Sequence, residues 1–565
     1  MANYAKHVSR KVTPQSQKAA KGQKKNAAGG FTFVIDDWQR LDRFLILGAE
    51  GGTFYVGENK LVKENAKCVE KLLKSKKNGL KVVQRTVEIS QSGRAAKNDP
   101  AIFVLALAAS CDKDEVRKAA LEALPQVCRT GTHLFHFASM VNELRGWGRG
   151  LRKAVANWYN AKDADRLAYQ LVKYQQRDGW SNKDLLRLSH AGSDAPTEAH
   201  QAAYRWVVAG DDRGKRKVVR KTKSGEVTKR YAAVKEMPKL IEAYEQIKSA
   251  KSEKKVVKLI REHRLTHEMV PNEFKNSPAV WEALLEHMPV TAMIRNLGKL
   301  TNIGLIKPLS KATNHVVDTV TDLERLKKAR VHPLQVLTAL KIYQQGHGMK
   351  GSLTWSPNQK VADALDDAFY LAFDAVEPTG KNQLIAIDAS GSMSARFAGS
   401  PVTCAEAAAA MAMVTARTEK NHHMMYFSSG GGGTWGYHNS SQSLAGIADL
   451  NISPKARLDA VVKNIASKNW GGTDCSLPML WADHNKADVD AFVILTDNDT
   501  WASKVCHPHQ ALVKYRKSSG INAKLAVVGM TATRFSIADP NDAGEIDIVG
   551  FDPSVPNLIA DFIRD

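Results

Sequence analysis

Between residues 62 and 344, apolar side chains recur at intervals of three and four positions in a series of short segments. Such spacing gathers the apolar side chains on one face of a helix, and polar or Gly- and Pro-containing stretches separate the segments. Amphipathic helices in series can stack in pairs around a continuous core, so the pattern predicts an irregular α-solenoid of the HEAT kind. The clearest predicted helices are 100–110, 114–128, 133–144, 150–160, 163–176, 238–248 and 277–288.

Beyond about residue 360 the pattern changes to short apolar runs that alternate with helical segments. Nearly continuous apolar strands alternating with helices are typical of a parallel sheet covered on both faces. We therefore predict a Rossmann-like α/β domain after a boundary near 360–375. Its predicted strands are 383–390, 422–429, 490–499 and 523–531, and its predicted helices are 404–418, 455–467 and 508–517.

The first 30 residues have a different character from both regions. They contain seven Lys and Arg, no acidic residue and little apolar patterning, which predicts a flexible basic arm. The chain then divides into an arm (1–30), a helical-repeat module (31–365) and an α/β domain (366–565). The expected fold class is mainly α plus α/β.

Composition limits the class of protein. The chain has 565 residues, too many for one ordinary core, and its 43% hydrophobic and 25% charged residues are those of a globular protein. No apolar run is long enough to span a bilayer, and no secretion signal begins the chain, so we expect a cytoplasmic protein without membrane contact. Six cysteines without CxxC spacing indicate reduced thiols: Cys68, Cys111, Cys128, Cys404, Cys475 and Cys506.

The charge is strongly asymmetric. The formal net charge is +23, yet residues 376–565 hold 16 Lys and Arg against 19 Asp and Glu, a net charge of −3, which leaves +26 for residues 1–375. A surplus of this size attracts polyanions. Nucleic acid is the favoured partner of the first part, and an anionic membrane surface is the weaker alternative.

The stretch LIAIDASGSMS places a carboxylate and two hydroxyls directly after a predicted strand. Ligands of open α/β sheets bind beyond the carboxyl ends of the strands, where Thr473 and Asp497 also occur. Carboxylates and hydroxyls suit a divalent metal, most of all Mg²⁺. The alternative is a turn that only caps the next helix. The five candidate ligands are Asp388, Ser390, Ser392, Thr473 and Asp497.

These five residues, in this order, resemble the metal-ion-dependent adhesion site of von Willebrand factor A domains. In that family a partner's acidic side chain completes the coordination of the ion. The resemblance therefore implies a docking module and no hydrolysis. The chain also lacks a GxxxxGK[ST] loop for nucleotide phosphates, so we do not expect an enzyme.

Two basic stretches are candidates for binding nucleic-acid phosphates. Residues 211–230 hold nine Lys and Arg, on a β-ribbon or a disordered loop, although a solvated surface loop is the alternative. In the second stretch, Arg residues are interleaved with Trp147 and Trp158, which could stack on unpaired bases, although Trp158 fits a helix core better. The candidate residues are Lys215, Arg216, Lys217, Arg220 and Lys221 in the first stretch, and Arg145, Arg149 and Arg152 in the second.

A third candidate group is sparse. Lys173 and Arg177 lie four positions apart, which would place them on one face of a predicted helix, and His190 follows at the end of the next helix. Taken alone, these three residues would mean little.

Several long segments resemble the Ro autoantigen family, which joins a TROVE module to a von Willebrand factor A domain. They are NAAGGFTF, WQRLDRFLILGAEGGTFY, GWSNKDLLRLSHAG, MPVTAMIRNLGKLT, HPLQVLTALKIYQQGHG and the DASGSMS, GGTDC and LTDND series. The resemblance implies a ring of HEAT-like repeats that the von Willebrand factor A domain closes. It also implies that small structured Y RNAs bind the outer surface, through Lys173, Arg177 and His190, and that single-stranded 3′ ends of misfolded RNAs enter the central hole.

The resemblance extends to partners and to the type of organism. Bacterial members are thought to pair with an exoribonuclease through a Y RNA, and the compact chain favours a bacterial member. A ring closed within one chain needs no second subunit, so we expect a monomer. Two other functions stay open: a metal-dependent protein-docking scaffold, and a metal-dependent ribonuclease that uses Asp388. Helix phase alone does not identify the residues that line the hole.

Overall fold

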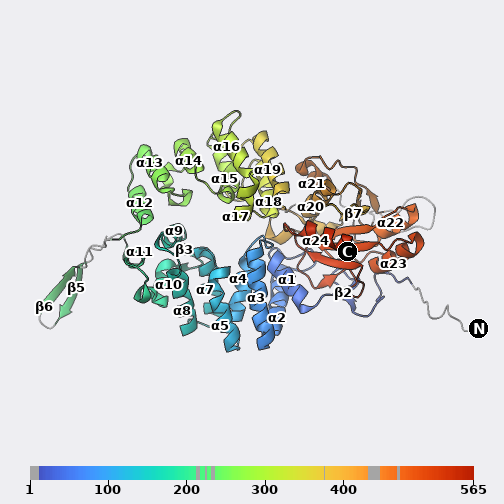
Figure 1. The fold of residues 1–565 in the computed structure, drawn as a ribbon, viewed down its shortest axis with the longest axis horizontal. Helices are drawn as coiled ribbons and strands as arrows, with labels where there is room; N and C mark the ends of the chain where they lie inside the picture. Colours follow the sequence, from blue (N-terminus) through green and yellow to red (C-terminus); the bar gives the residue numbers. More distant parts are fainter. Residues whose placement is uncertain are drawn as a thin grey trace, which may run out of the picture.

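The computed structural model describes residues 12–210, 217–222, 225–230, 236–373, 376–429, 446–466 and 471–565. Figure 1 shows two parts: helices that curve around a central opening, and a sheet domain on the side where the two ends of this curve meet. The predicted fold class, a helical-repeat ring followed by an α/β domain, is confirmed.

The helical module packs its helices against their neighbours in sequence, as expected for stacked repeats. Three short 3₁₀ segments interrupt it: η2 (Ala191–Asp194), η3 (His267–Met269) and η4 (Asn272–Phe274). The helices are α1 (Asp37–Leu47), α2 (Glu58–Leu73), α3 (Lys76–Ser92), α4 (Asp99–Ser110), α5 (Asp114–Glu122), α6 (Leu124–Val127), α7 (Gly131–Leu144), α8 (Arg149–Asn160), α9 (Ala164–Lys173), α10 (Asn182–Ser189), α11 (Glu198–Ala209), α12 (Lys239–Lys248), α13 (Glu253–His263), α14 (Pro278–Leu285), α15 (Val290–Asn302), α16 (Lys311–Val320), α17 (Leu323–Ala329), α18 (Pro333–Gln345) and α19 (Gln359–Leu371).

Local sequence explains where individual helices start and how they face. Ser and Thr side chains cap several helices; for example, the Thr130 hydroxyl accepts a hydrogen bond from the His133 N–H at the start of α7. Helix α4 is apolar on nearly all sides and is enclosed by α3, α5 and α7. None of the helices in the described part of the chain is both long and apolar enough to cross a membrane.

The two ends of the helical module meet each other. The His332 ring lies 3.2 Å from the carbonyl oxygen of Arg94, and Gln335 Nε2 donates to the Ala96 carbonyl, which joins the start of α18 to the turn between α3 and α4. Arg94 also pairs with Asp552 of the α/β domain at 3.2 Å. The ring is therefore closed by contacts within the helical module as well as by the second domain.

The α/β domain is built on a six-stranded sheet of order β13-β11-β10-β7-β8-β9, in which all neighbours are parallel except the antiparallel edge strand β9. The strands are β7 (Gln383–Asp388), β8 (His422–Phe427), β9 (Ile447–Asp449), β10 (Ala491–Thr496), β11 (Lys524–Gly529) and β13 (Glu545–Val549). The helices of this domain are α20 (Cys404–Thr418), α21 (Leu458–Ala466), α22 (Leu477–Asn485), α23 (Pro508–Ser519) and α24 (Val555–Arg564).

The sheet is buried on both faces, and its alternating side chains enter two separate cores. Ile385 and Ile387 of β7 pack into the core that is continuous with the helical module and includes α20. Leu384 and Ala386 point the other way, into a smaller core with α22 and α23. This period-two alternation makes both faces apolar, which explains the continuous hydrophobic runs in the sequence.

The N-terminal segment corrects one prediction. Residues 12–30 are not a flexible arm, because they fold against the α/β domain; residues 1–11 lie outside the described part. Strand β1 (Gln23–Lys25) pairs with β2 (Phe31–Val34), and β2 pairs with β12 (Phe535–Ser536), in a small antiparallel sheet. Polar side chains stabilise this contact, and they leave no apolar periodicity in the sequence from which it could be predicted.

For the basic stretch 211–230, the sequence left a β-ribbon and a loop as alternatives. Its described residues form a β-ribbon. Strand β5 (Lys217–Thr222) pairs with β6 (Gly225–Arg230) in antiparallel register. Figure 1 shows this hairpin apart from the ring, on the side opposite the α/β domain.

Candidate metal site and nucleic-acid interface

The candidate metal ligands of the first motif lie at the carboxyl edge of the sheet. Asp388 ends β7, and its Oδ1 accepts a hydrogen bond from the Ser390 N–H at 2.9 Å. The hydroxyls of Ser390 and Ser392 lie 3.1 Å apart. Because β7 and β10 are neighbours in register, their ends adjoin: Thr496 Oγ1 donates to Asp388 Oδ2 at 2.6 Å, and Asp497 follows directly. Two strands thus place carboxylates and hydroxyls around one point.

The fifth residue, Thr473, reaches the same point from a loop. Its carbonyl accepts hydrogen bonds from the N–H groups of Trp501 and Ala502, at 3.1 and 3.0 Å, while Gly391 N–H donates to the Gly471 carbonyl at 2.9 Å. These bonds tie the loop to the segments after β7 and β10. The Thr473 hydroxyl is completely buried and has no hydrogen-bond partner within the described residues. The structure therefore brings Asp388, Ser390, Ser392 and Asp497 together, and it ties the loop of Thr473 to the segments that carry them.

A turn that merely caps a helix does not explain this arrangement. Ser390 stands at the N-cap of a 3₁₀ segment, η5 (Gly391–Ser394), but its side chain makes no capping hydrogen bond. Its hydroxyl is instead directed to Ser392, inside the cluster.

The electrostatics of the cluster favour a cation. Burial raises the pKa of Asp388 to about 6, against the hydrogen bonds from Ser390 and Thr496. Burial, together with the charges of Asp499 and Asp388, raises the pKa of Asp497 well above its usual range. Three buried carboxylates close together destabilise one another unless a positive charge lies among them.

Asp499 is a site residue that the sequence analysis missed. Both of its carboxylate oxygens are buried and without a partner within the described residues, and burial followed by the Asp388 charge raises its pKa to about 7. The repeated spacing Asp497-Asn498-Asp499 was the available signal. No group of three or more His, Cys, Asp or Glu in the described residues is arranged to hold a metal, so a cation here would also rely on the Ser and Thr hydroxyls. The donor set fits a hard divalent ion.

The N-terminal segment supports this site from outside. Gln15 Oε1 accepts from the Thr500 hydroxyl at 2.8 Å, and Asn26 Nδ2 donates to the Thr500 carbonyl at 2.9 Å. Gly30 lies against the same loop so closely that a Cβ atom there would be 2.2 Å from the Thr500 carbonyl oxygen. The loop after β10 is thus held by a segment that lies more than 450 positions earlier in the sequence.

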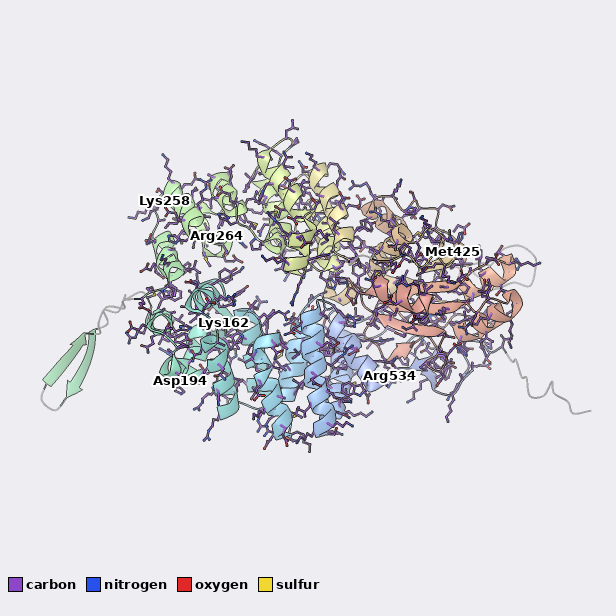
Figure 2. The ribbon with its side chains drawn as sticks, in the orientation of Figure 1. Lys162, Asp194, Lys258, Arg264, Met425 and Arg534 are labelled. Atoms are coloured by element: carbon purple, nitrogen blue, oxygen red, sulfur yellow. The ribbon has the colours of Figure 1, made fainter. Side chains whose placement is uncertain are left out.

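A basic cavity of about 750 Å³ lies at the inner edge of the ring. Figure 2 shows two of its lining residues, Lys162 and Arg264, on either side of one end of the central opening, whereas Lys258 and Asp194 lie at the outer edge. Its charged lining contains one acidic residue, Asp165. The basic lining residues are Arg129, Lys162, Arg166, Lys239, His263 and Arg264.

The pKa values of two of these basic groups, Lys162 and Arg129, are lowered. Burial lowers the pKa of Lys162 to about 8, although its Nζ donates to the Trp158 carbonyl at 2.6 Å and lies over the Trp158 ring. Burial, and then the charge of Arg330, lowers the pKa of Arg129. Cationic groups that burial destabilises in this way are stabilised when an anion binds.

A second cavity, of about 630 Å³, lies where α15 and α18 meet the α/β domain. Its charged lining residues are all basic: Lys97, Arg295, Lys299 and Lys350. The sequence did not identify the residues that line the central opening. The basic residues of these two cavities are candidates for that lining.

The candidates Lys173, Arg177 and His190 do not form one surface, and Lys173 and Arg177 do not share a helical face. Helix α9 ends at Lys173, and Arg177 lies in the short strand β3 (Gln176–Arg177), so the predicted helical pairing is wrong. Lys173 is half-buried: its Nζ donates to the Tyr169 hydroxyl at 2.9 Å and lies 3.6 Å from Glu268. Tyr169 also lines the basic inner cavity, so Lys173 lies near that cavity.

Arg177 and His190 belong to another, more exposed surface. Arg177 pairs in register with Trp180 of β4 (Trp180–Ser181), and Trp180 stacks on Trp147 at 5.5 Å. The Trp147 indole N–H donates to the carbonyl of Leu188, near the end of α10. His190 follows as the exposed C-cap of α10, in left-handed conformation (φ 56°). A partly buried aromatic pair, packed against the core, thus lies between two of the predicted RNA contacts.

The remaining basic candidates are divided between a groove and the hairpin. Arg145 and Arg149 line a groove of about 750 Å³ together with Arg117, Lys118 and Lys153, and Arg152 is exposed on the adjoining helix α8. Trp158 is buried in the core, as the alternative reading of that stretch expected. Three hairpin candidates lie in β5, namely Lys217, Arg220 and Lys221, whereas Lys215 and Arg216 lie outside the described residues.

Comparison with known proteins agrees with this architecture. The family model of the TROVE domain matches residues 24–341, and that of the Ro60 vWA domain matches residues 382–563. Fold and site therefore define a protein of the TROVE and von Willebrand factor A class. Within that class, the chain belongs to the Ro60 family, which confirms the resemblance seen in the sequence.

The relatives are similar over nearly their whole length. The chain is 38% identical to "RNA-binding protein RO60" of Deinococcus radiodurans, covering 100% of this chain and 99% of that protein. It is 36% identical to "RNA-binding protein RO60" of Caenorhabditis elegans, covering 98% of this chain and 92% of that protein. Among solved structures, the crystal structure of the Deinococcus radiodurans RO (RSR) protein is similar, with a TM-score of 0.65, 37% identity, and coverage of 94% of this chain and 99% of that one.

Proposed function

We propose that this protein is an RNA-binding component of a cytoplasmic ribonucleoprotein that acts in quality control or processing of noncoding RNA. Single-stranded 3′ ends of misfolded RNAs enter the central opening. The observation that carries this proposal is the inner cavity, where six basic side chains face one acidic side chain. The relatives named as RNA-binding proteins support it. Unpaired RNA suits a narrow basic passage, because its phosphates are reached without reading base edges in a groove.

The outer surface binds a small structured RNA of the Y RNA type. Arg177, His190 and the stacked pair Trp147 and Trp180 supply an exposed cation, an exposed imidazole ring and partly buried aromatic faces within one connected surface. Lys173 contributes from the border between this surface and the inner cavity. Through the bound Y RNA, an exoribonuclease is recruited to the RNA whose end is held in the ring.

The metal site serves docking instead of catalysis. Mg²⁺ is held by Asp388, Ser390, Ser392, Thr473 and Asp497, and a carboxylate from a protein partner completes its coordination. The unpartnered, buried Thr473 hydroxyl and the crowded carboxylates support this reading. The protein acts as a monomer and carries no catalytic residue of its own.

The central test separates the two RNA surfaces. We expect Arg166→Gln/Arg264→Gln to weaken binding of a duplex with a single-stranded 3′ tail by about tenfold or more. Losing two phosphate contacts should also lower the salt slope of that binding by about 1.4, since each single-strand contact contributes about 0.7. Lys173→Ala/Arg177→Ala and His190→Ser should instead weaken binding of a structured small RNA. Gel-shift titrations of both RNAs at several salt concentrations measure both effects.

Lys258→Gln is the matched control, because Lys258 is an exposed cation of the same module at the outer edge. It should change neither RNA affinity by more than about twofold. If the inner variant binds the tailed RNA like the wild type, with an unchanged salt slope, the proposed path through the opening is wrong. Metal-dependent loss of intact RNA that Asp388→Ala abolishes would instead favour a ribonuclease.

A further inference from the structure

The loop between α1 and α2, residues 48–57 of the helical module, lies beside the metal site of the other domain. A Cβ atom on Gly51 would lie 3.6 Å from Gly399 and 3.8 Å from the Arg396 side chain, both in the segment that follows the DxSxS motif. The loop is internally fixed, since Thr53 N–H donates to the Val56 carbonyl at 2.7 Å and Val56 is buried. Part of the helical module therefore forms one wall of the metal site.

Tyr55 is the residue of this loop that reaches the cluster. Its half-buried hydroxyl lies close to Ser392 and Trp501 and within electrostatic range of Asp497 and Asp499. A tyrosine hydroxyl carries its proton at neutral pH and can donate a hydrogen bond.

Trp501 supplies a second donor at the same place. Its ring packs on Gly472, where a Cβ atom would lie 2.6 Å from the indole, and its backbone N–H is bonded to Thr473. The indole N–H is buried and meets no acceptor in hydrogen-bonding geometry within the described residues, although Tyr55 lies next to it. A buried donor without an acceptor is costly, which indicates that a ligand atom satisfies it.

We propose that the Tyr55 hydroxyl and the Trp501 indole N–H form the anion-binding side of the metal site. They donate to the free oxygen of an acidic partner residue whose other carboxylate oxygen binds the metal. This inference rests on the metal site of the proposed function and adds the two residues that select a carboxylate.

The charges of the site make this binding depend on the metal. Without a cation, the site offers an incoming carboxylate no positive charge, and the acidic side chains of Asp388, Asp497 and Asp499 line its approach. With the cation bound, the repulsion is reduced, and the two donors decide which group fits. The free oxygen of a metal-bound carboxylate can accept hydrogen bonds from both Tyr55 and Trp501, whereas a metal-bound water can accept from only one of them.

The rim of the site suits an acidic residue on a protein surface. Arg396 is exposed beside the loop and has no ion pair within the described residues, so it favours the approach of a negative segment. Phe54, next to Tyr55, is 57% exposed and offers apolar contact area. Because Tyr55 and Phe54 belong to the helical module, the partner binds both domains at once.

The test uses the full-length protein, Mn²⁺ as the metal and glutarate as the carboxylate. Enhancement of water proton relaxation reports Mn²⁺ binding, and its decrease reports displacement of metal-bound water by glutarate. We expect Tyr55→Phe and Trp501→Phe to keep the Mn²⁺ dissociation constant within about twofold of the wild type. Each should raise the glutarate dissociation constant by about tenfold, the usual effect of one hydrogen bond to a charged group.

Tyr244→Phe is the matched control, because it removes a tyrosine hydroxyl from α12, on the far side of the ring, where that hydroxyl accepts from Gln175. It should leave both constants unchanged. Glutarate binding that is unaffected in both site variants while Mn²⁺ still binds would overturn this inference alone. Failure of the wild type to bind Mn²⁺, or glutarate binding without metal, would overturn the metal site and this inference together.

Discussion

At the residue scale, burial sets the charge state of several acidic groups in the α/β domain. Glu545 of β13 is one case outside the metal site: burial, against the effect of the hydrogen bond from the Asp539 N–H, raises its pKa to about 8. The charges of Asp542 and Asp539 raise this pKa further, and Arg516 of α23 lowers it in part. The buried Oε1 of Glu545 has no partner within the described residues. The fold therefore favours the protonated side chain.

A pH-dependent stability follows from Glu545. Its folded-state pKa lies above the unfolded value of 4.5, so the folded state holds the proton more tightly, and stability is lost as the pH rises from about 4.5 through 8. Glu545→Gln keeps an acceptor for the Asp539 N–H and removes the ionisation. We expect this variant to melt a few degrees above the wild type at pH 8.5 and close to it at pH 5. Thermal unfolding at both pH values measures the difference.

Glu324→Gln changes an exposed glutamate of α17 in the same way and serves as the control. It should not alter the pH dependence. An equal shift of Glu545→Gln at both pH values would mean that packing, and not ionisation, distinguishes the variant.

At the element scale, the N-terminal segment acts as a brace for the loop after β10, which carries Asp497 and Asp499 of the candidate metal site. It buries polar side chains instead of apolar ones: Gln15, Gln23 and Asn26 are 0%, 3% and 5% exposed. Each is satisfied by groups in the loop after β10 or near the start of α23. Buried polar groups with specific partners fix one arrangement, because any shift leaves them unpaired.

Gly30 is the point of closest approach in this brace. Gly30→Val should displace the loop, because even a Cβ atom there would be 2.2 Å from the Thr500 carbonyl oxygen and 2.7 Å from the Trp501 Cα. We expect a loss of about 1–3 kcal/mol of stability, as is usual for overpacking, and at least a tenfold weaker Mn²⁺ affinity. Thermal unfolding and Mn²⁺ titration measure the two effects.

Gly57→Ala is the comparison variant, since no atom lies within 4 Å of a Cβ placed there, at the start of α2. Its Mn²⁺ affinity should equal that of the wild type. If Gly30→Val loses stability but binds Mn²⁺ normally, the N-terminal segment does not hold the metal loop in place.

At the scale of the whole molecule, the ring and the α/β domain are joined by buried charge as well as by apolar contact. Arg43 of α1 is 2% exposed, pairs with Asp547 of β13 at 2.5 Å, and donates to the carbonyls of Thr533 and Phe535 at 2.9 and 2.7 Å. The core on one face of the sheet continues into the helical module. The position of Tyr55 beside the metal site depends on this joint.

Removing the guanidinium should loosen the joint. Arg43→Met leaves the Asp547 carboxylate and two carbonyls without their partner, a change that costs about 3–5 kcal/mol when the groups are buried. We expect the variant to unfold in two separated calorimetric transitions where the wild type has one. Faster amide hydrogen exchange in β12 and β13 should accompany this separation.

The matched control is Arg40→Met, on the same helix, because Arg40 pairs with Glu64 inside the helical module at 3.1 Å. It should lower stability without separating the transitions. A single transition in Arg43→Met, at an unchanged temperature, would show that apolar packing alone joins the two domains.

The sequence by itself determined the features that each segment carries locally. The period of three to four apolar positions predicted the helices, and continuous apolar runs predicted the strands of the parallel sheet. The clustering of Asp388 with Asp497 was also predictable, because they stand at the carboxyl ends of two strands of one parallel sheet, and such ends share an edge. The DxSxS motif, followed in order by Thr473 and Asp497, was enough to name the five candidate ligands.

Only the tertiary structure decided what depends on distant partners. Residues 12–30 have no apolar pattern of their own, yet they fold, because Gln15 and Asn26 find hydrogen bonds 485 and 474 positions away. Helix α9 stops at Lys173, so Arg177 turns onto another surface. The basic lining around Lys162 exists because α9 and α12 pack together. Apolar periodicity shows which face of a single helix or strand is buried. The closing of the ring, and the contact of Tyr55 with the candidate metal site of the other domain, depend on which of these faces pack against each other.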